Sequence, residues 1–287
     1  MLNKLVLGTA QFGLDYGINN SNGKVKLNEV YKILDFAFEN NILTLDTAAS
    51  YGNAESLIGN YFKENPEKEF KIITKISSYD KTLEEQMYSS IQRLNIEKID
   101  CLFFHSLSLY KHFFKELESF KKKFKGIKFE EIGVSIYTDR EIGFIVDENQ
   151  IDRVQLPFNL LDNSSLRKKS ILKLHSKGIK VDARSIFLQG LFFKPFRTLH
   201  PYFKPLIDDL RKINEITIEL NQSIDEVAIK YVYQKEFINR VVIGVDSLEH
   251  FKTNVEFLKQ PILNDYSKID SIVVSNRKLL YPYLWPK

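Results

Sequence analysis

The chain has 287 residues, of which 44% are hydrophobic and 27% charged, a balance typical of a folded globular protein rather than a disordered one. Its 41 basic and 37 acidic residues give a net charge of only +4, which does not indicate nucleic acid or a membrane surface as a partner. The single cysteine, Cys101, excludes an intrachain disulfide. With no signal sequence and no apolar run of about 20 residues, the sequence predicts a cytoplasmic protein.

Eight short apolar runs, each about as long as a buried strand, alternate with longer segments of helical periodicity. The runs cover residues 4–8, 42–46, 71–75, 101–105, 131–135, 153–156, 179–183 and 240–244. In one connecting segment Val30, Ile33, Leu34 and Ala37 share a helical face. Strands that alternate with helices predict βαβ units and a parallel sheet.

The spacing of the runs indicates how the units are arranged. The ends of the second to fifth runs are 29, 30 and 30 residues apart, the length of one strand–helix unit. Eight such units predict a single α/β domain, a (β/α)8 TIM barrel over residues 1–287, with an extended last crossover (about 184–240) and a C-terminal tail. Two helical segments, around 203–220 and 223–235, occupy that crossover. A doubly wound sheet is the alternative, but no two of the twelve glycines form a G-x-G turn.

Polar side chains end consecutive runs: Asp46, Lys75, His105 and Ser135, with Gln155 near the end of the sixth. Because the carboxyl ends of barrel strands share one face and neighbouring strands are about 5 Å apart, we expect these side chains to meet. The five histidines have no H-x-H or HExxH spacing, so we expect no metal site. No G-x-S-x-G elbow supports a serine nucleophile.

Tyr51, which follows Asp46 closely, supplies a phenol for proton transfer. A lysine cation about 4 Å away favours the phenolate by up to about 4 kcal/mol at an effective dielectric of about 20, and Asp46 would reduce this effect while holding Lys75 in place. With His105 polarising a carbonyl oxygen, such a site suits carbonyl reduction, and a cofactor must supply the hydride. A Schiff-base aldolase acting through Lys75 is an alternative, although a lysine kept charged beside Asp46 is a poor nucleophile.

Several segments resemble the aldo-keto reductases, (β/α)8 enzymes that use a nicotinamide cofactor, mostly NADPH. The resemblance spans about residues 4–260 and is carried by LDTAASYGNAESLIG, IITK, SIQRLNIEKIDCLFFHS, IGVS, VQLPFNLLD and RVVIGVDSLEHFKTN. It implies that Tyr51 is the general acid, that Lys75 tunes the phenol, that Asp46 pairs with Lys75 and that His105 orients the substrate carbonyl.

The resemblance also implies a set of cofactor contacts. These are Gly8, Thr9 and Asp46; Ser135 and Gln155 at the nicotinamide carboxamide; Arg184; Ser185, Leu188 and Gly190 at the pyrophosphate; and Ser247, His250 and Asn254 at the adenosine.

The sequence departs from the family pattern at three places. Ile136 follows Ser135 where members often have Asn, and Arg184 stands where many place a tyrosine against the nicotinamide ring. A guanidinium can still stack on a ring, and it could attract an anionic substrate. Asp246 stands in a turn where NADPH-selective members usually carry Lys and Arg, which would favour NADH. Weighing the family's usage against this turn, we favour NADP(H) slightly over NAD(H).

We therefore expect an NAD(P)H-dependent aldo-keto reductase that reduces a small aldehyde or ketone, with a sugar derivative as one candidate, and that is a monomer or small homo-oligomer. Candidate pocket walls are Phe12, Tyr16, Phe187 and the tail with Trp285; candidate polar contacts are Gln11, Asn159 and Arg184. The segments GTAQFG and ARSIFLQGL also resemble reductases linked to bacterial surface-sugar metabolism. An aldose dehydrogenase running in the oxidative direction and a reductase-fold regulatory subunit are the alternatives.

Overall fold

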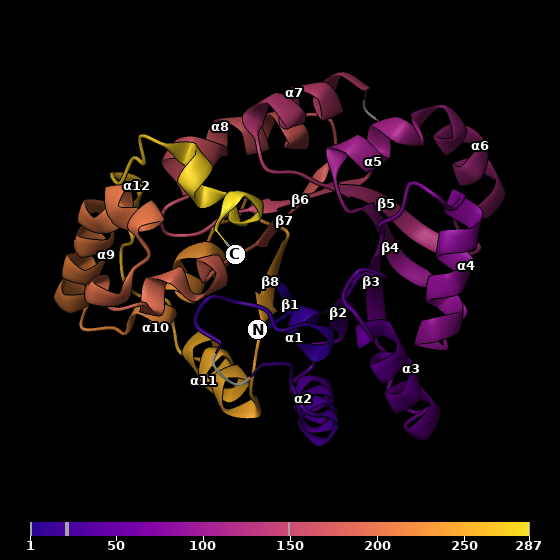
Figure 1. The fold of residues 1–287 in the computed structure, drawn as a ribbon, viewed down its shortest axis with the longest axis horizontal. Coiled ribbons are helices and arrows are strands. Elements are labelled where there is room, and N and C mark those ends of the chain that lie inside the picture. Colours follow the sequence, from indigo (N-terminus) through magenta and orange to yellow (C-terminus); the bar gives the residue numbers. More distant parts are fainter. Residues whose placement is uncertain (1, 21–22, 149, 287) are drawn as a thin grey trace.

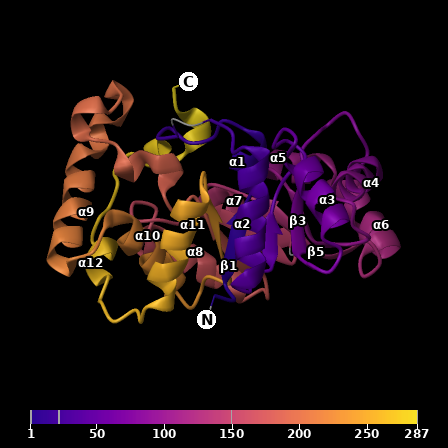
Figure 2. The same ribbon diagram turned by 90° about the horizontal axis from the view of Figure 1, so that it is seen from below.

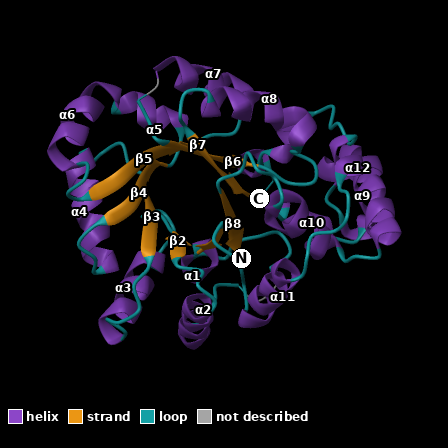
Figure 3. Ribbon diagram, turned by 180° about the vertical axis from the view of Figure 1, so that it is seen from behind, coloured by secondary structure: helices purple, strands orange, loops and turns teal. Residues whose placement is uncertain are grey.

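Eight parallel strands form a closed ring in the computed structural model, which describes residues 2–20, 23–148 and 150–286. Each strand pairs with the next in sequence, and β1 pairs with β8, as the ring in Figure 3 shows. The strands are β1 (Leu5–Gly8), β2 (Thr44–Asp46), β3 (Lys71–Ile76), β4 (Ile99–Phe104), β5 (Phe129–Ser135), β6 (Arg153–Pro157), β7 (Lys180–Arg184) and β8 (Arg240–Gly244). The predicted (β/α)8 TIM barrel is confirmed.

Helices surround this ring (Figures 1 and 3). They are α1 (Ala10–Gly13), α2 (Leu27–Glu39), α3 (Ala54–Glu64), α4 (Leu83–Leu94), α5 (Leu107–His112), α6 (Phe114–Phe124), α7 (Asp139–Glu148), α8 (Ser164–His175), α9 (Ile207–Leu220), α10 (Ile224–Tyr233), α11 (Leu248–Lys259) and α12 (Ser267–Asp270). None of the helices in the described ranges is both long and apolar enough to cross a bilayer.

The core has two layers. One fills the barrel with Val6, Ile73, Cys101, Phe103 and Val242, and a larger one lies between the strands and the helices. Gly133 makes room for the inner layer, because a Cβ there would lie 2.7 Å from the ring of Phe103. Bulky side chains thus pack the barrel centre, which leaves the carboxyl ends of the strands to carry a site.

The chain between β7 and β8 is long and contains, besides α9 and α10, three 3-10 helices: η1 (Leu188–Phe193), η2 (Phe196–Thr198) and η3 (Pro201–Leu206). The tail contains η4 (Arg277–Leu280) and η5 (Pro282–Leu284) and lies on the same side of the barrel as α1, opposite the N-terminus (Figure 2). Residues 1 and 287, the ends of the predicted domain, lie outside the described residues.

All the strands except β8 differ by one or two residues at an end from the apolar runs that predict them, and two of these differences bear on the strand ends. The run 42–46 becomes strand only from Thr44, because Asn41 adopts a left-handed φ of 57° and the N–H of Ile42 still bonds to the carbonyl of Ala37 at the end of α2. The run 101–105 belongs to a strand that begins at Ile99 and ends at Phe104, so His105 is the first residue of the following loop.

Candidate active site

A buried ion pair lies where β2 and β3 end. Lys75 Nζ is 2.5 Å from Asp46 Oδ1 and donates a second hydrogen bond to the carbonyl of Thr47 at 2.8 Å. The other carboxylate oxygen, Asp46 Oδ2, accepts from Gln155 Nε2 at 2.7 Å. Because both charged side chains are almost fully buried, at 2% and 3% exposure, each depends on the other for compensation.

The loop after β2 places Tyr51 above this pair. Lys75 Nζ lies 5.1 Å from the centroid of the Tyr51 ring. Gly13 at the end of α1 lies against this loop, where an added Cβ would be 1.8 Å from the carbonyl oxygen of Tyr51. The pKa of Tyr51 is raised above its ordinary value, first by burial and then by the negative charge of Asp46. The sequence predicts the opposite direction, from Lys75, but the positive charge of Lys75 is compensated by Asp46 at 2.5 Å.

His105 lies edge-on to Tyr51, with ring centroids 5.8 Å apart. Burial lowers the pKa of His105 to about 3, and the positive charges of Lys75 and Arg184 act in the same direction. The imidazole is therefore neutral near pH 7. Its Nδ1 is 3.0 Å from Ser50 Oγ and 3.4 Å from Ser77 Oγ. When Ser50 donates to Nδ1, the ring proton sits on Nε2.

A cavity of about 360 Å³ opens beside these residues and extends to the start of α11. The predicted site residues that line it are Gly8, Thr9, Asp46, Tyr51, Gln155, Arg184, Ser185, Gly190, His250 and Asn254. Other predicted contacts are not among its walls: Lys75, His105, Ser135, Leu188 and Ser247.

Local structure explains why two of the predicted contacts lie off the cavity. The hydroxyl of Ser247 caps α11 by accepting from the N–H of His250 at 3.2 Å. The side chain of Leu188 is fully buried in the core. Two residues predicted to contact the substrate serve the fold instead. Phe12 is fully buried in the core, and Asn159 Oδ1 accepts from the N–H groups of Leu161 and Asp162.

Trp285 packs edge-on against Phe203, with ring centroids 4.8 Å apart, and is not a wall of this cavity.

Sequence reasoning missed several walls of the cavity. Gly17, Asn19 and Asn20 come from the loop after α1, and Asp225 comes from the first turn of α10. The N–H of Ile18 bonds to the carbonyl of Gln189 at 2.9 Å, so this loop reaches the chain after β7. For the loop after α1, the turn-rich composition of residues 15–23 is the signal that the sequence offers. For Asp225 the sequence offers no signal, because the path of the extended crossover decides where this residue lies.

Comparisons with known proteins agree with this geometry. A model described as the aldo/keto reductase family matches residues 4–273. A comparison with curated protein sequences gives no match. Similar solved structures include aldo-keto reductase AKR11C1 from Bacillus halodurans in its holo form, at a TM-score of 0.74 and 19% identity, covering 94% of this chain and 92% of the other.

PA4992 of Pseudomonas aeruginosa, assigned to the aldo-keto reductases, has a TM-score of 0.63 at 18% identity, with 88% of both chains covered. At such low identity these two structures show a shared fold alone, whereas the family model covers most of the sequence. This chain therefore belongs to the aldo/keto reductase family, whose enzymes carry out NAD(P)-dependent carbonyl reduction.

Proposed function

We propose that this protein reduces an aldehyde or ketone to an alcohol with a nicotinamide cofactor and with Tyr51 as the general acid. One observation carries the proposal: the phenol of Tyr51, the Lys75–Asp46 pair and the neutral imidazole of His105 lie together, and Tyr51 and Asp46 line a cavity of about 360 Å³. The fully buried Cys101, with no partner for a disulfide, supports a cytoplasmic location.

The cavity walls fit a dinucleotide. Gln11 Oε1 is buried and has no hydrogen-bond partner among the described residues, and a Cβ on neighbouring Gly244 would lie 2.7 Å from the Gln11 amide. A buried amide oxygen that lacks a protein donor and lies beside a cavity is a group that a ligand donor can satisfy. Gly8, Thr9, Gln155, Ser185 and Gly190 would hold such a cofactor near Tyr51, and His250 and Asn254 would hold it at α11. A bound nicotinamide supplies the hydride that carbonyl reduction requires.

The protein residues control the proton. A raised pKa keeps Tyr51 protonated at neutral pH, so its proton is available to a carbonyl oxygen that gains charge. His105 donates a hydrogen bond from Nε2 to the same oxygen and stabilises that charge. Asp46 holds Lys75 Nζ 5.1 Å from the centroid of the Tyr51 ring, so the phenolate that remains lies beside an ion pair whose charges largely cancel. The aldose dehydrogenase alternative would need Tyr51 as the phenolate, a form that the raised pKa disfavours at neutral pH.

The residues that line the cavity favour NAD(H), whereas the family resemblance favours NADP(H). Asp225 and Asp246 line its walls, whereas Arg184, near Tyr51, is the sole Lys or Arg among the described lining residues. Asp246 Oδ1 lies 2.5 Å from His250 Nδ1, where the adenosine half is expected. A carboxylate there repels a 2′-phosphate and can accept a hydrogen bond from a ribose hydroxyl.

Hydroxyl groups around His105 support a hydroxylated substrate such as a sugar derivative. Ser50 and Ser77 contact its ring, and Tyr79 donates to Ser108 Oγ at 2.8 Å on the neighbouring rim. A substrate that extends from Tyr51 toward His105 would meet these hydroxyl groups, with which its own hydroxyls can exchange hydrogen bonds.

Tyr51→Phe tests the catalytic assignment. We expect kcat/KM for aldehydes to fall by at least about 1,000-fold, because the general acid is lost while the ring packing stays. The dissociation constant for NADH, measured by fluorescence titration, should change by less than about threefold. Ser165→Ala, on α8 and away from the cavity, is the matched hydroxyl control and should keep full turnover.

Full carbonyl turnover by Tyr51→Phe would falsify the assignment. A wild-type protein that binds NADH but turns over no member of a panel of sugars and aldehydes would instead support the regulatory-subunit alternative.

A further inference from the structure

Arg184 is a cation beside the proposed catalytic residues, and no carboxylate pairs with it. It ends β7, is half-buried and lines the cavity with Tyr51 and Tyr16. Its positive charge opposes the rise in the pKa of Tyr16 and Tyr51 that burial causes, and it adds to the lowering of the pKa of His105 by burial. Within the described ranges it forms no ion pair; its guanidinium bonds only to neutral acceptors, the carbonyl of Ile136 and Ser185 Oγ, both at 3.3 Å.

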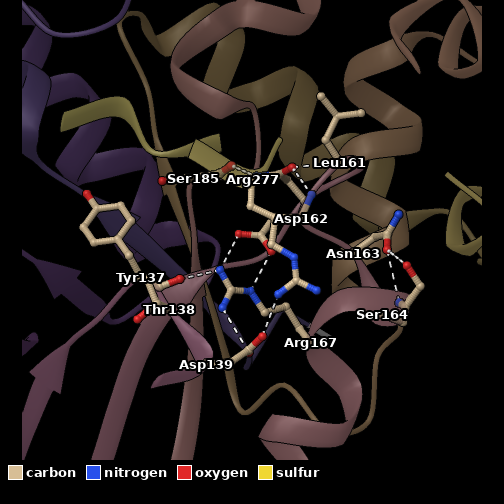
Figure 4. Close-up of polar contacts among 12 residues, drawn as sticks. Tyr137, Thr138, Asp139, Leu161, Asp162, Asn163, Ser164, Arg167, Ser185 and Arg277 are labelled. Atoms are coloured by element: carbon tan, nitrogen blue, oxygen red, sulfur yellow. Dashed lines mark hydrogen bonds and ion pairs between the residues drawn. The ribbon is translucent and has the colours of Figure 1, made fainter. Parts of the chain in front are cut away.

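A rigid polar network holds Arg184 in this place. Its guanidinium stacks on the ring of Tyr137, 4.2 Å from the centroid. Figure 4 shows the contacts that hold the loop bearing Tyr137: Arg167 donates to Asp162 at 2.6 Å and to the carbonyl of Tyr137 at 2.5 Å. Since the loop bearing Tyr137 is fixed, the guanidinium that stacks on it is fixed too.

The ion pairs of this network do not include Arg184. Arg167 and Arg277 compensate Asp162 and Asp139, with Arg277 Nη1 lying 2.7 Å from Asp139 Oδ2 (Figure 4). Lys75 and Asp46 compensate each other, and His105 is neutral. The end of the cavity beside Tyr51 therefore carries one cation that has no carboxylate partner among the described residues, on a half-buried group whose planar fork of donors matches an oxyanion.

We propose that Arg184 determines substrate specificity by binding an anionic group, a carboxylate or a phosphate, on the same molecule as the carbonyl. This inference rests on the proposed function. Five N–H groups are available on the guanidinium and two are used by Ile136 and Ser185, so three remain for a ligand. The carbonyl must come within hydrogen-bond reach of Tyr51, and an anion a few bonds away then reaches Arg184 in the same cavity.

The test compares pairs of aldehydes in which one member carries an anionic group that the other lacks. Succinic semialdehyde against butanal probes a carboxylate, and glyceraldehyde 3-phosphate against glyceraldehyde probes a phosphate. For the wild type we expect kcat/KM to favour the anionic member of at least one pair by about tenfold or more, and that pair identifies the anion. Arg184→Gln should abolish the preference, bringing the ratio of kcat/KM for the anionic and neutral members to within about threefold of unity.

Two further variants complete the design. Arg184→Lys keeps the charge without the fork and should retain part of the preference, mostly as a raised KM. Arg211→Gln, an exposed arginine on α9, should leave every ratio unchanged. Equal kcat/KM for both members of both pairs in the wild type overturns the proposal. The proposal is also overturned if Arg184→Gln lowers kcat/KM for both members of a pair by the same factor, since Arg184 would then serve the cofactor or the chemistry. Tyr51→Phe tests the proposed function separately, because it should abolish activity on all four substrates whether or not Arg184 binds an anion.

Discussion

At the scale of single residues, the surroundings decide what each ionisable group can do. Lys75 and Asp46 form one neutral unit, with 2.5 Å between Nζ and Oδ1, so Tyr51 responds mainly to burial and to the nearby carboxylate. His105 loses its charge for a similar reason, with its pKa near 3. An acid that stays protonated beside a neutral hydrogen-bond donor suits a site that adds a proton to a developing alkoxide.

Asp246 offers a test of cofactor choice at a single residue. Asp246→Asn removes the negative charge at the adenosine end of the cavity but keeps a polar side chain of the same size. We expect the ratio of the dissociation constants, NADPH over NADH, to fall by about tenfold, or about 1.4 kcal/mol, because the repulsion of a 2′-phosphate is lost. Fluorescence titration with each cofactor measures the ratio.

The control for that change is Asp208→Asn, on α9 and paired only with Arg211 at the surface, which should leave the ratio unaltered. A wild-type protein that binds NADPH more tightly than NADH would contradict the preference that we propose.

At the scale of elements, the close approach of α1 to the loop after β2 positions Tyr51. Gly13 leaves no space for a side chain, and the N–H of Ala54 at the start of α3 bonds to the carbonyl of Tyr51 at 3.0 Å. Tyr51 is thereby held by its backbone between two helices. Gly52, with a φ of 54°, takes a left-handed conformation that allows this sharp turn.

Gly13→Ala should displace this turn. A Cβ 1.8 Å from the carbonyl oxygen of Tyr51 forces the backbone apart, with an expected loss of about 1–3 kcal/mol in the free energy of unfolding. Because misplacing a catalytic group by about 1 Å can cost about 100-fold, kcat should fall at least tenfold. Urea unfolding and steady-state kinetics measure the two effects.

Gly143→Ala is the matched control, since Gly143 is exposed in α7 and an added Cβ meets nothing within 4 Å. This change should stabilise the protein by up to about 1 kcal/mol through helix propensity and leave kcat unchanged. If Gly13→Ala were as stable and as active as the wild type, the close approach would not be what positions Tyr51.

At the scale of the whole molecule, charges are enclosed at the amino-terminal half of the barrel. Asp182 on β7 is fully buried; Arg153 Nη1 donates to its Oδ1 at 2.7 Å, and its Oδ2 has no partner among the described residues. Burial raises the pKa of Asp182 to about 6 although Arg153 acts in the opposite direction.

We propose that the barrel, the long crossover and the tail unfold as one domain, since Trp285 joins the tail to Phe203 of the crossover.

This buried carboxyl makes stability depend on pH. Between about pH 4 and pH 6 the unfolded chain has lost the proton of Asp182 while the folded protein keeps it, so the contribution of Asp182 to the free energy of unfolding falls as pH rises, by about 3 kcal/mol in total. Asp182→Asn cannot ionise and should flatten the slope in this window. Urea unfolding at pH 4, 5, 6 and 7 measures the free energy of unfolding, and we expect a single transition at each pH. The control, Asp208→Asn, should keep the wild-type dependence on pH. If Asp182→Asn showed the same dependence as the wild type, the assignment to Asp182 would be refuted.

The sequence by itself determined the architecture and the identity of the residues that meet at the strand ends. Strand runs, helical periodicity and unit length are local properties, so eight βα units can be recognised without a structure, and Asp46, Lys75 and His105 follow from where the runs stop. Only the tertiary structure decided the sign of the Tyr51 pKa shift, the entry of Asp225 into the cavity and the stacking of Arg184 on Tyr137. These properties depend on burial and on charges that distant segments bring together through space, which no periodicity along the chain encodes.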